Sequence, residues 1–227
     1  MKTRGDTSEK RRNKRGEATR EALLRATITC LQRGGYGATS IEAVMAEAAV
    51  GRGSVLNQFP TRHDLILAVA EVAMGEMMDT ARSALDRVGD PVARLIALAD
   101  IAWQVHNSAP ATALTEILLA SRWDHALATG LRPIVEPVDR RIDRMNAQLA
   151  RDAGITDLGR FLVHGRLLGS NMRGLTIELM FNANRAMILS AVEAVKQGHI
   201  ELVERLLGSP TELHREWDFD PPSLERH

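Results

Sequence analysis

Four side chains that can hydrogen-bond to the edges of nucleic-acid bases lie close together in the segment 52–58, Arg-Gly-Ser-Val-Leu-Asn-Gln. An arginine binds guanine through two hydrogen bonds, and an asparagine or glutamine binds adenine in the same way. A serine hydroxyl can serve either a base or a phosphate. The segment therefore indicates nucleic-acid recognition by Arg52, Ser54, Asn57 and Gln58, although an ordinary exposed polar helix face has the same composition.

The elements around this segment are predicted to form a helix-turn-helix. A first helix spans about 17–33 and ends at the glycines of 34–37, because glycine readily takes the left-handed conformation that follows a helix. A second, short helix covers about 40–48. A third runs from about 51 to 59, where the following Pro60 disfavours helix. In such a pair the second helix fits the major groove of DNA, so the candidate base-reading side chains lie on the right element.

Two capping signatures mark the starts of neighbouring helices. Thr39 and Glu42 fit a capping box, in which the threonine hydroxyl binds the amide of the glutamate and the glutamate reaches back. Thr61 and Asp64 fit a similar signature at the start of a long fourth helix, about 61–87. Helix starts also carry free amides and a partial positive charge, which suit phosphate.

The rest of the chain is also predicted to be helical. Apolar residues recur at helical spacing nearly throughout, strand-like alternation is lacking, and aromatic residues make up only 4%. The fold class is therefore all-α, with about nine helices. Pro133 and Pro137 should kink or interrupt the segment from about 123 to 153. The last two helices are expected at about 156–181 and 183–207.

The charge balance hides a strong asymmetry along the 227 residues. Lys plus Arg and Asp plus Glu each total 29, so the formal net charge is zero. The first 70 residues carry +5 and the remainder −5, and the excess of positive charge lies in the first 20. We expect residues 1–16 to form a basic, disordered arm that is attracted to a polyanion. The polar segment 208–227 is expected to be a flexible tail.

Other function classes find little support in the sequence. The seven histidines show no paired metal-ligand spacing, and no glycine-rich loop follows a strand. Cys30 has no cysteine partner and lies on a helix needed for packing, so an inert thiol is expected. We therefore expect neither an enzyme nor a metal or other cofactor. A charged N-terminus and the lack of a long apolar stretch predict no signal peptide, no membrane span and a cytoplasmic location.

Three stretches together resemble the DNA-binding domain of the TetR family of bacterial transcriptional regulators. They are Thr-Arg-Glu-Ala-Leu-Leu-Arg-Ala at 19–26, Gly-Tyr-Gly-Ala-Thr-Ser-Ile at 35–41, and Ala-Ala-Val-Gly-Arg-Gly-Ser-Val-Leu-Asn-Gln-Phe-Pro-Thr-Arg at 48–62. The chain departs from the family pattern at three positions. Ala49 replaces a turn glycine, Gly51 replaces a capping Ser or Thr, and Leu56 replaces a phosphate-binding aromatic residue.

The resemblance implies a division of labour among the candidate residues. The third helix would read the operator through Arg52, Ser54, Asn57 and Gln58. The phosphate contacts would come from the starts of the second and fourth helices, at Thr39, Ser40, Thr61 and Arg62. It also implies that 17–62 is the DNA-binding domain and that 63–207 binds a small effector and forms a homodimer.

A heptad pattern supports the dimer independently. Apolar and small residues recur every seven positions on the two last predicted helices, which would form a four-helix bundle with a second copy. Packing of the same residues within one chain is the alternative. The predicted interface comprises Leu158, Phe161, Gly165, Leu168, Met172, Leu175, Leu179, Ile188, Val192, Val195 and Leu202.

Effector-binding residues are harder to choose. Large or polar side chains on the predicted helices of 63–207 are candidates, although each is more often part of a core. They are Trp103, His106, Trp123, Met145 and His164. By resemblance the protein is a dimeric repressor that a small molecule releases from a palindromic operator on double-stranded DNA. The alternative is a DNA-binding dimer without a small-molecule effector, controlled by a protein partner or acting architecturally.

Overall fold

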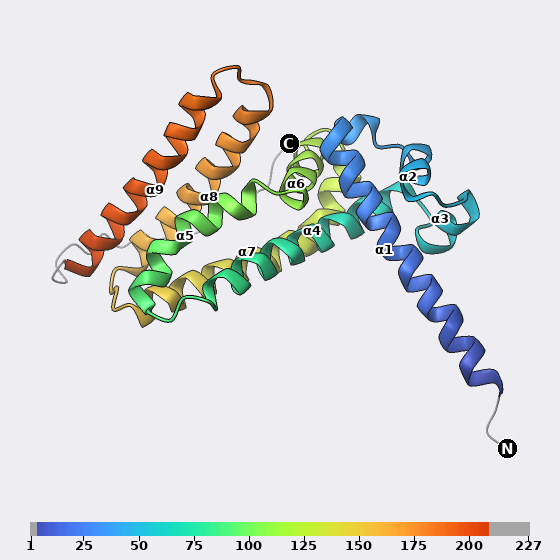
Figure 1. The fold of residues 1–227 in the computed structure, drawn as a ribbon, viewed down its shortest axis with the longest axis horizontal. Coiled ribbons are helices and arrows are strands. Elements are labelled where there is room, and N and C mark those ends of the chain that lie inside the picture. The colour runs from blue at the N-terminus through green and yellow to red at the C-terminus, as the bar shows by residue number, and fades with distance from the viewer. Residues whose placement is uncertain (1–3, 209–227) are drawn as a thin grey trace. The chain divides into compact units, whose positions relative to one another are not determined.

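A computed structural model describes residues 4–208, with side chains from residue 14 onward. Within this range the chain forms nine helices and no strand, which confirms the predicted all-α class (Figure 1). Residues 1–3 and 209–227 lie outside the described residues, and with them most of the predicted tail. The helices are α1 (Arg4–Ala38), α2 (Ile41–Ala48), α3 (Arg52–Gln58), α4 (Arg62–Leu85), α5 (Pro91–His106), α6 (Ala109–Ala120), α7 (His125–Asp152), α8 (Leu158–Phe181) and α9 (Arg185–Gly208).

The helix α1 is longer than the sequence predicted. It begins at Arg4, whereas a disordered arm was expected as far as residue 16. Lysine, arginine and glutamate, which dominate this stretch, are good helix formers, so a helix that is already packed further on extends backwards at low cost. The predicted glycine stop is confirmed at Gly35, whose φ of 72° and ψ of 179° break the regular helix.

The chain forms two compact units. Unit 1 comprises residues 1–84 and 104–140, and unit 2 comprises 85–103 and 141–227. The domain boundary expected after residue 62 therefore falls inside unit 1, because α4, α6 and the first part of α7 share a core with the three N-terminal helices. That core includes Leu23 and Leu31 of α1 and Ile117 of α6.

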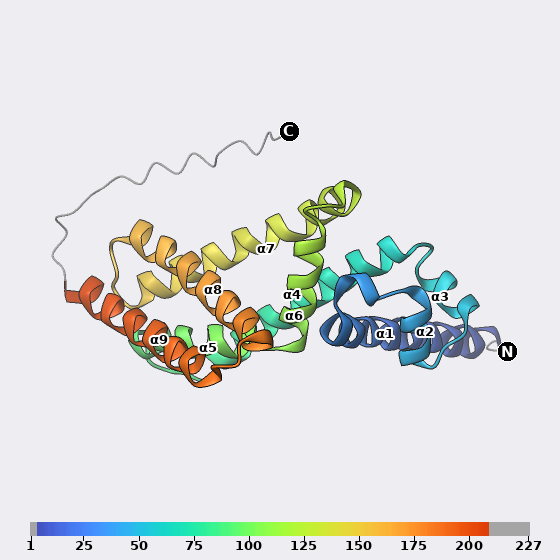
Figure 2. The same ribbon diagram turned by 90° about the horizontal axis from the view of Figure 1, so that it is seen from above.

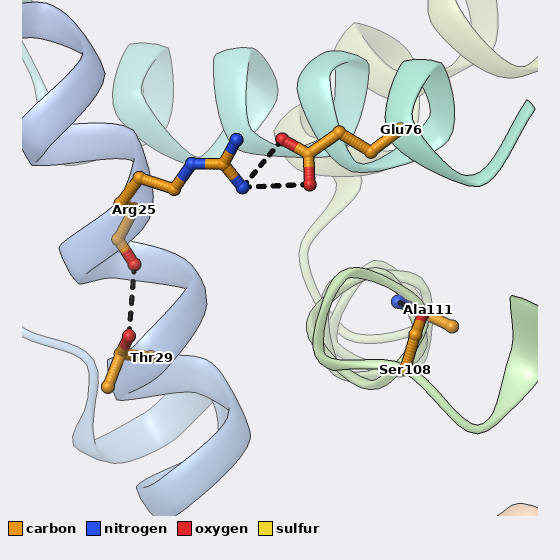
Figure 3. Close-up of polar contacts among 5 residues, drawn as sticks. All are labelled: Arg25, Thr29, Glu76, Ser108 and Ala111. Carbon is orange, nitrogen blue, oxygen red and sulfur yellow. Dashed lines mark hydrogen bonds and ion pairs between the residues drawn. The ribbon is translucent and has the colours of Figure 1, made fainter. Parts of the chain in front are cut away.

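Unit 1 holds α1, α2 and α3 side by side, as both ribbon views show (Figure 2). The long helix α4 is attached to these three helices through an ion pair. Arg25 of α1 contacts Glu76 of α4, with nitrogen–oxygen distances of 2.8 and 2.9 Å (Figure 3). The pair is partly exposed, so its contribution to stability is modest. The apolar core supplies most of the attachment.

The two predicted caps have different outcomes. The capping box on Thr39 is wrong, because Ser40 is the N-cap of α2 and its hydroxyl accepts from the amide of Ala43 at 3.1 Å. The helix starts one residue later than predicted, and the Thr39 hydroxyl instead donates to the carbonyl of Gly35 at 2.8 Å. The signature at Thr61 and Asp64 is confirmed by reciprocal hydrogen bonds between them at 2.7, 3.0 and 3.1 Å.

The turn between α2 and α3 places Ala49 in the left-handed region, with φ 53° and ψ 42°. The chain therefore uses the backbone that a glycine would adopt here, at a cost of about 1–2 kcal/mol for a residue with a Cβ atom. The turn keeps a backbone hydrogen bond despite this strain, because the Ala49 amide still donates to the carbonyl of Ala46.

The strain at Ala49 gives a first prediction. Ala49→Gly should raise the free energy of unfolding by about 0.5 kcal/mol, because relief of strain exceeds the added entropy of the unfolded chain. Ala46→Gly is the matched control in the exposed part of α2, and it should lower the same quantity by about 1 kcal/mol. Urea denaturation measures both, and equal losses would contradict the strained turn.

The helix α7 runs unbroken through Pro133 and Pro137, contrary to the predicted interruption. The two prolines are four residues apart and both exposed, so they share one face of the helix. Each proline removes one backbone hydrogen bond, and the carbonyls thereby freed belong to the same solvent-facing side. Water can satisfy them, which removes most of the reason for the helix to break.

Unit 2 is built from α5, α8, α9 and the second part of α7. The helices α8 and α9 lie side by side (Figures 1 and 2). A core of Ala99, Leu168, Met172 and Val192 joins α5, α8 and α9. Much of the predicted dimer stripe therefore packs within the chain, which is the alternative left open by the sequence. Its buried members are Phe161, Leu168, Met172, Ile188 and Val192.

Candidate DNA-binding site

The helix α3 is held by two side chains and exposes most of the others. Val55 and Phe59, at its middle and end, are buried in the core of unit 1. Arg20 of α1 lies over the ring of Phe59, 4.6 Å from its centre, and adds a cation–π contact. A seven-residue helix would be unstable alone, so these contacts fix both its position and its orientation.

The exposed face of α3 carries three of the four predicted base-reading residues. Arg52, Ser54 and Asn57 are exposed. The Arg52 guanidinium lies 3.8 Å from the carboxylate of Glu42, and both side chains are about 70% exposed, so this pair is weak and easily exchanged for DNA. Gln58 is half-buried and lies against α1 near Gly16. The geometry is suited to reading DNA, and the individual contacts stay predictions.

Of the two phosphate-binding residues predicted at the start of α2, one lies at the surface and the other is buried. Ser40 is exposed and caps the helix, so the free amides of the first turn lie beside it. Thr39 is only 1% exposed, and its hydroxyl is used inside the chain. The register error in the capping prediction explains this difference, since it assigned to Thr39 the position that Ser40 occupies.

Arg62 at the start of α4 is engaged by the protein itself. Its Nε donates to the carbonyl of Thr39 at 2.8 Å, and its Nη2 donates to the carbonyl of Tyr36 at 2.7 Å. The guanidinium also lies 4.2 Å from the centre of the Tyr36 ring. Arg62 thus ties α4 to the segment that joins α1 and α2. Thr61 is exposed, and its hydroxyl is already hydrogen-bonded to Asp64.

The same junction is reached by a carboxylate from α6. The amide of Tyr36 donates to Oε2 of Glu116 at 3.1 Å, directly after the break at Gly35. A Cβ atom on Gly35 would lie 2.9 Å from that oxygen, so the left-handed φ and the carboxylate both require glycine there. Tyr36 and Glu116 were not predicted as site residues, because they are 80 positions apart and no local pattern links them.

The five predicted effector residues are divided between the two units. Trp103, Met145 and His164 belong to unit 2, and the other two, His106 and Trp123, belong to unit 1. Trp123 is 85% exposed on the turn before α7, so it is a surface residue and not the lining of a cavity. Trp103 packs against the core of α5, α8 and α9.

His164 is paired with a histidine that the sequence did not single out. Its Nε2 lies 2.9 Å from Nδ1 of His199, whose Nε2 lies 2.7 Å from the carbonyl of Leu95. A carbonyl only accepts, so the Nε2–H of His199 donates to it, Nδ1 of His199 accepts, and the Nε2–H of His164 donates. Burial, and then the proximity of His199, lower the pKa of His164 from 6.5 to about 4. Burial also lowers the pKa of His199.

These histidines predict a specific pH dependence. Between about pH 6.5 and 4 the unfolded chain binds protons at His164 that the folded chain does not, so the free energy of unfolding should fall as the pH falls through this range. Above pH 6.5 the pair should have no effect. The charged groups on the surrounding helices form ion pairs and are Asp100, Asp143, Arg166, Glu193 and Lys196.

The variant His164→Gln separates the pair from other titrating groups, because glutamine can still donate to His199 without binding a proton. Chemical denaturation at pH 7.5, 6, 5 and 4.5 should show a smaller loss of stability in this variant than in the unmodified protein. Parallel losses would contradict the assignment.

Within the described residues, no cluster of three or more His, Cys, Asp or Glu side chains could hold a metal ion. None of the helices in the same residues is both long and apolar enough to cross a membrane.

Comparison with known proteins agrees with the geometry. Residues 23–69 match the family model for bacterial regulatory proteins of the tetR family. The HTH-type transcriptional regulator CymR from Pseudomonas putida is 26% identical over 219 residues, covering 92% of this chain and 96% of that protein.

Solved structures of transcriptional regulators share the fold. One from Rhodococcus sp. Rha1 has a TM-score of 0.67 at 17% identity, covering 84% of this chain and 99% of that chain. One from Saccharomonospora viridis in complex with choline has a TM-score of 0.65 at 17% identity, covering 83% of this chain and 96% of that chain. The helix-turn-helix of α2 and α3 lies within the residues that match the family model, and the chain is similar to the CymR regulator over most of its length. Residues 23–69 therefore form a DNA-binding domain of the tetR family type.

Proposed function

We propose that the protein is a homodimeric repressor that binds a palindromic operator through α3 and is released by a small-molecule effector. The proposed role of α3 in DNA binding is supported by how the helix is packed. Val55 and Phe59 fix it to the core, and Arg52, Ser54 and Asn57 remain exposed. Leu56, 49% exposed on the same helix, would contact a thymine methyl group where the family commonly has an aromatic residue.

Dimerisation through the outward face of α8 and α9 completes the proposal. Large apolar side chains are exposed there, and two helix-interior glycines, Gly174 and Gly198, have open space where a Cβ atom would be. Glycine inside a helix costs about 1 kcal/mol relative to alanine, and close approach of a second copy would account for it. The exposed apolar residues on these two helices are Leu167, Met180, Phe181, Met187 and Leu189.

This face uses a different heptad register from the one that the sequence indicated. Leu167, Gly174 and Phe181 are seven residues apart and exposed on α8. The other heptad register, which includes Leu168, is more apolar, and its side chains are directed into the interior of the chain. Two recognition helices in such a dimer would be spaced about 34 Å apart, one turn of the duplex.

A substitution at Gly198 tests the dimer. Gly198→Leu should leave the fold intact, because nothing in the chain lies within 4 Å of the added Cβ atom, and it should weaken self-association at least about tenfold through a clash with the second copy. Gly75→Leu on the exposed face of α4, also with open space, is the matched control and should leave the dimer unchanged. Sedimentation equilibrium measures both, and identical association in the two variants would contradict this interface.

Control by a small molecule is supported by the related fold of the S. viridis regulator, which was solved in complex with choline. Release of the protein from its bound DNA by candidate metabolites, followed by fluorescence anisotropy, tests it. A metabolite that binds the protein and lowers its affinity for DNA is expected. Ligands that bind without changing that affinity would favour the second candidate, a DNA-binding dimer without a small-molecule effector.

A further inference from the structure

The backbone at Tyr36 is held by two opposite charges that come from different helices. Its amide donates to Oε2 of Glu116 on α6 at 3.1 Å, and its carbonyl accepts from Nη2 of Arg62 on α4 at 2.7 Å. Hydrogen bonds to charged groups are roughly twice as strong as those between neutral groups. The two peptide groups that flank Tyr36 are therefore fixed, and the position of this residue depends on α4 and α6.

The approach of Glu116 to this backbone follows from the packing of α1 against α6. Leu31 of α1 and Ile117, the neighbour of Glu116, are fully buried in the core of unit 1, and Glu116 itself is half-buried. Its Oε2 lies 2.9 Å from the place where a Cβ atom on Gly35 would be, so the carboxylate reaches the backbone only because this residue is glycine. The contact is therefore fixed by the fold and is not a chance meeting of two surface groups.

A short segment connects Tyr36 to the DNA-reading elements, and hydrogen bonds within it limit its freedom. The amide of Thr39 donates to the carbonyl of Tyr36 at 3.3 Å, and the hydroxyl of Thr39 donates to the carbonyl of Gly35 at 2.8 Å. Ser40, the next residue, caps α2. The start of α2 is thus tied to the backbone that Glu116 holds, and α2 packs against α3.

We propose that Glu116 is a positioning residue for DNA recognition, because its carboxylate holds the Tyr36 amide and so sets where α2 and α3 lie relative to α4 and α6. Side chains that bind base edges must be held to within about 0.5 Å of their productive position. Glu116 acts through the backbone and is not one of the exposed residues of α3. This role rests on the proposed DNA-reading function of α3 and adds a residue that controls it from another helix.

The charge of Glu116 separates a positioning role from an electrostatic one. Removal of a negative charge raises the attraction of a protein for the phosphate backbone of DNA. A role through charge alone therefore predicts tighter DNA binding in a variant that lacks the carboxylate. A positioning role predicts weaker binding, and only to the DNA sequence that α3 reads.

A general loss of stability can be separated in the same way. The free energy of unfolding of a typical protein is large enough that a variant lacking one hydrogen bond remains more than about 95% folded. Unfolded protein would therefore reduce the apparent affinity for DNA very little, and it would do so equally for every duplex. A large loss confined to one sequence indicates altered geometry of the helix-turn-helix.

Fluorescence anisotropy of the full-length protein tests this role, with a duplex that the protein has selected from random DNA and a scrambled duplex of the same length. Glu116→Ala should weaken binding to the selected duplex about tenfold and binding to the scrambled duplex less than about twofold. Glu116→Gln keeps an oxygen that accepts from the Tyr36 amide, and it should stay within about twofold of the unmodified protein on both duplexes. Glu71→Ala is the matched control, because it removes the same charge from an exposed position of α4 in unit 1, and it should weaken neither interaction.

Unchanged or tighter binding of the selected duplex by Glu116→Ala, equal losses on the two duplexes, or a loss in Glu116→Gln as large as in Glu116→Ala would each overturn the proposal. Hydrogen exchange of the unmodified protein without DNA keeps it testable if a variant does not fold. The Tyr36 amide should be protected, and exchange at the rate of an unstructured chain would overturn the proposal. If the unmodified protein selects no duplex, the proposed function fails, whereas variants without effect on a selected duplex overturn only the role of Glu116.

Discussion

Replacing Arg62 by alanine should lower the free energy of unfolding by about 2–3 kcal/mol in the absence of DNA. The side chain makes two charge-assisted hydrogen bonds to the carbonyls of Thr39 and Tyr36 and lies over the Tyr36 ring, and all three contacts would be lost. Specific DNA binding should fall as well, because the start of α2 would lose its attachment to α4.

The variant Arg62→Lys distinguishes this positioning role from the predicted phosphate contact. Lysine keeps the positive charge but cannot reproduce the planar fork that binds two carbonyls. Its unfolding free energy in urea should therefore remain closer to that of Arg62→Ala than to that of the unmodified protein. A lysine variant with unchanged stability and near-normal DNA affinity would restore Arg62 to the list of phosphate contacts.

Replacing Arg52 or Asn57 by alanine should reduce affinity for the operator by about 1–3 kcal/mol each, or roughly 5- to 150-fold. Both side chains are exposed on α3, and neither contributes to the core that Val55 and Phe59 form. Stability should therefore be nearly unchanged, and affinity for unrelated DNA should fall much less than affinity for the operator.

Arg151→Ala is the charge-matched control for Arg52→Ala, because Arg151 is an exposed arginine at the end of α7 in unit 2. It should leave both affinities unchanged. Fluorescence anisotropy with operator and scrambled duplexes measures the ratio. Equal losses on the two duplexes for Arg52→Ala would make Arg52 a phosphate contact instead of a base contact.

Local patterns predicted the elements of the candidate DNA-binding site well. Glycine at 35, proline at 60 and the pair Thr61 and Asp64 act over a few residues, so helix ends near them are visible in the sequence. The cap at Ser40 was misplaced by one residue, because adjacent Thr39 and Ser40 are both good caps and only the packing of Thr39 decides between them.

Features that depend on distant contacts were not visible. The link between Tyr36 and Glu116 and the pairing of His164 with His199 join helices far apart in the sequence. The face of α8 that is buried was also misjudged, because two overlapping heptad registers exist and the more apolar one, with Leu168, covers the interior of the chain. Periodicity finds a stripe, but it does not say whether the stripe meets the same chain or a second copy.

Selection of bound sequences from random duplex DNA by the full-length protein tests whether a dimer reads DNA through α3. We expect enrichment of one inverted repeat whose half-sites are centred about one helical turn, 10–10.5 base pairs, apart. The same selection with Asn57→Ala should lose preference at one base pair in each half-site while the spacing is kept. Enrichment of a single asymmetric site, or of no sequence at all, would contradict a dimer that reads DNA through α3.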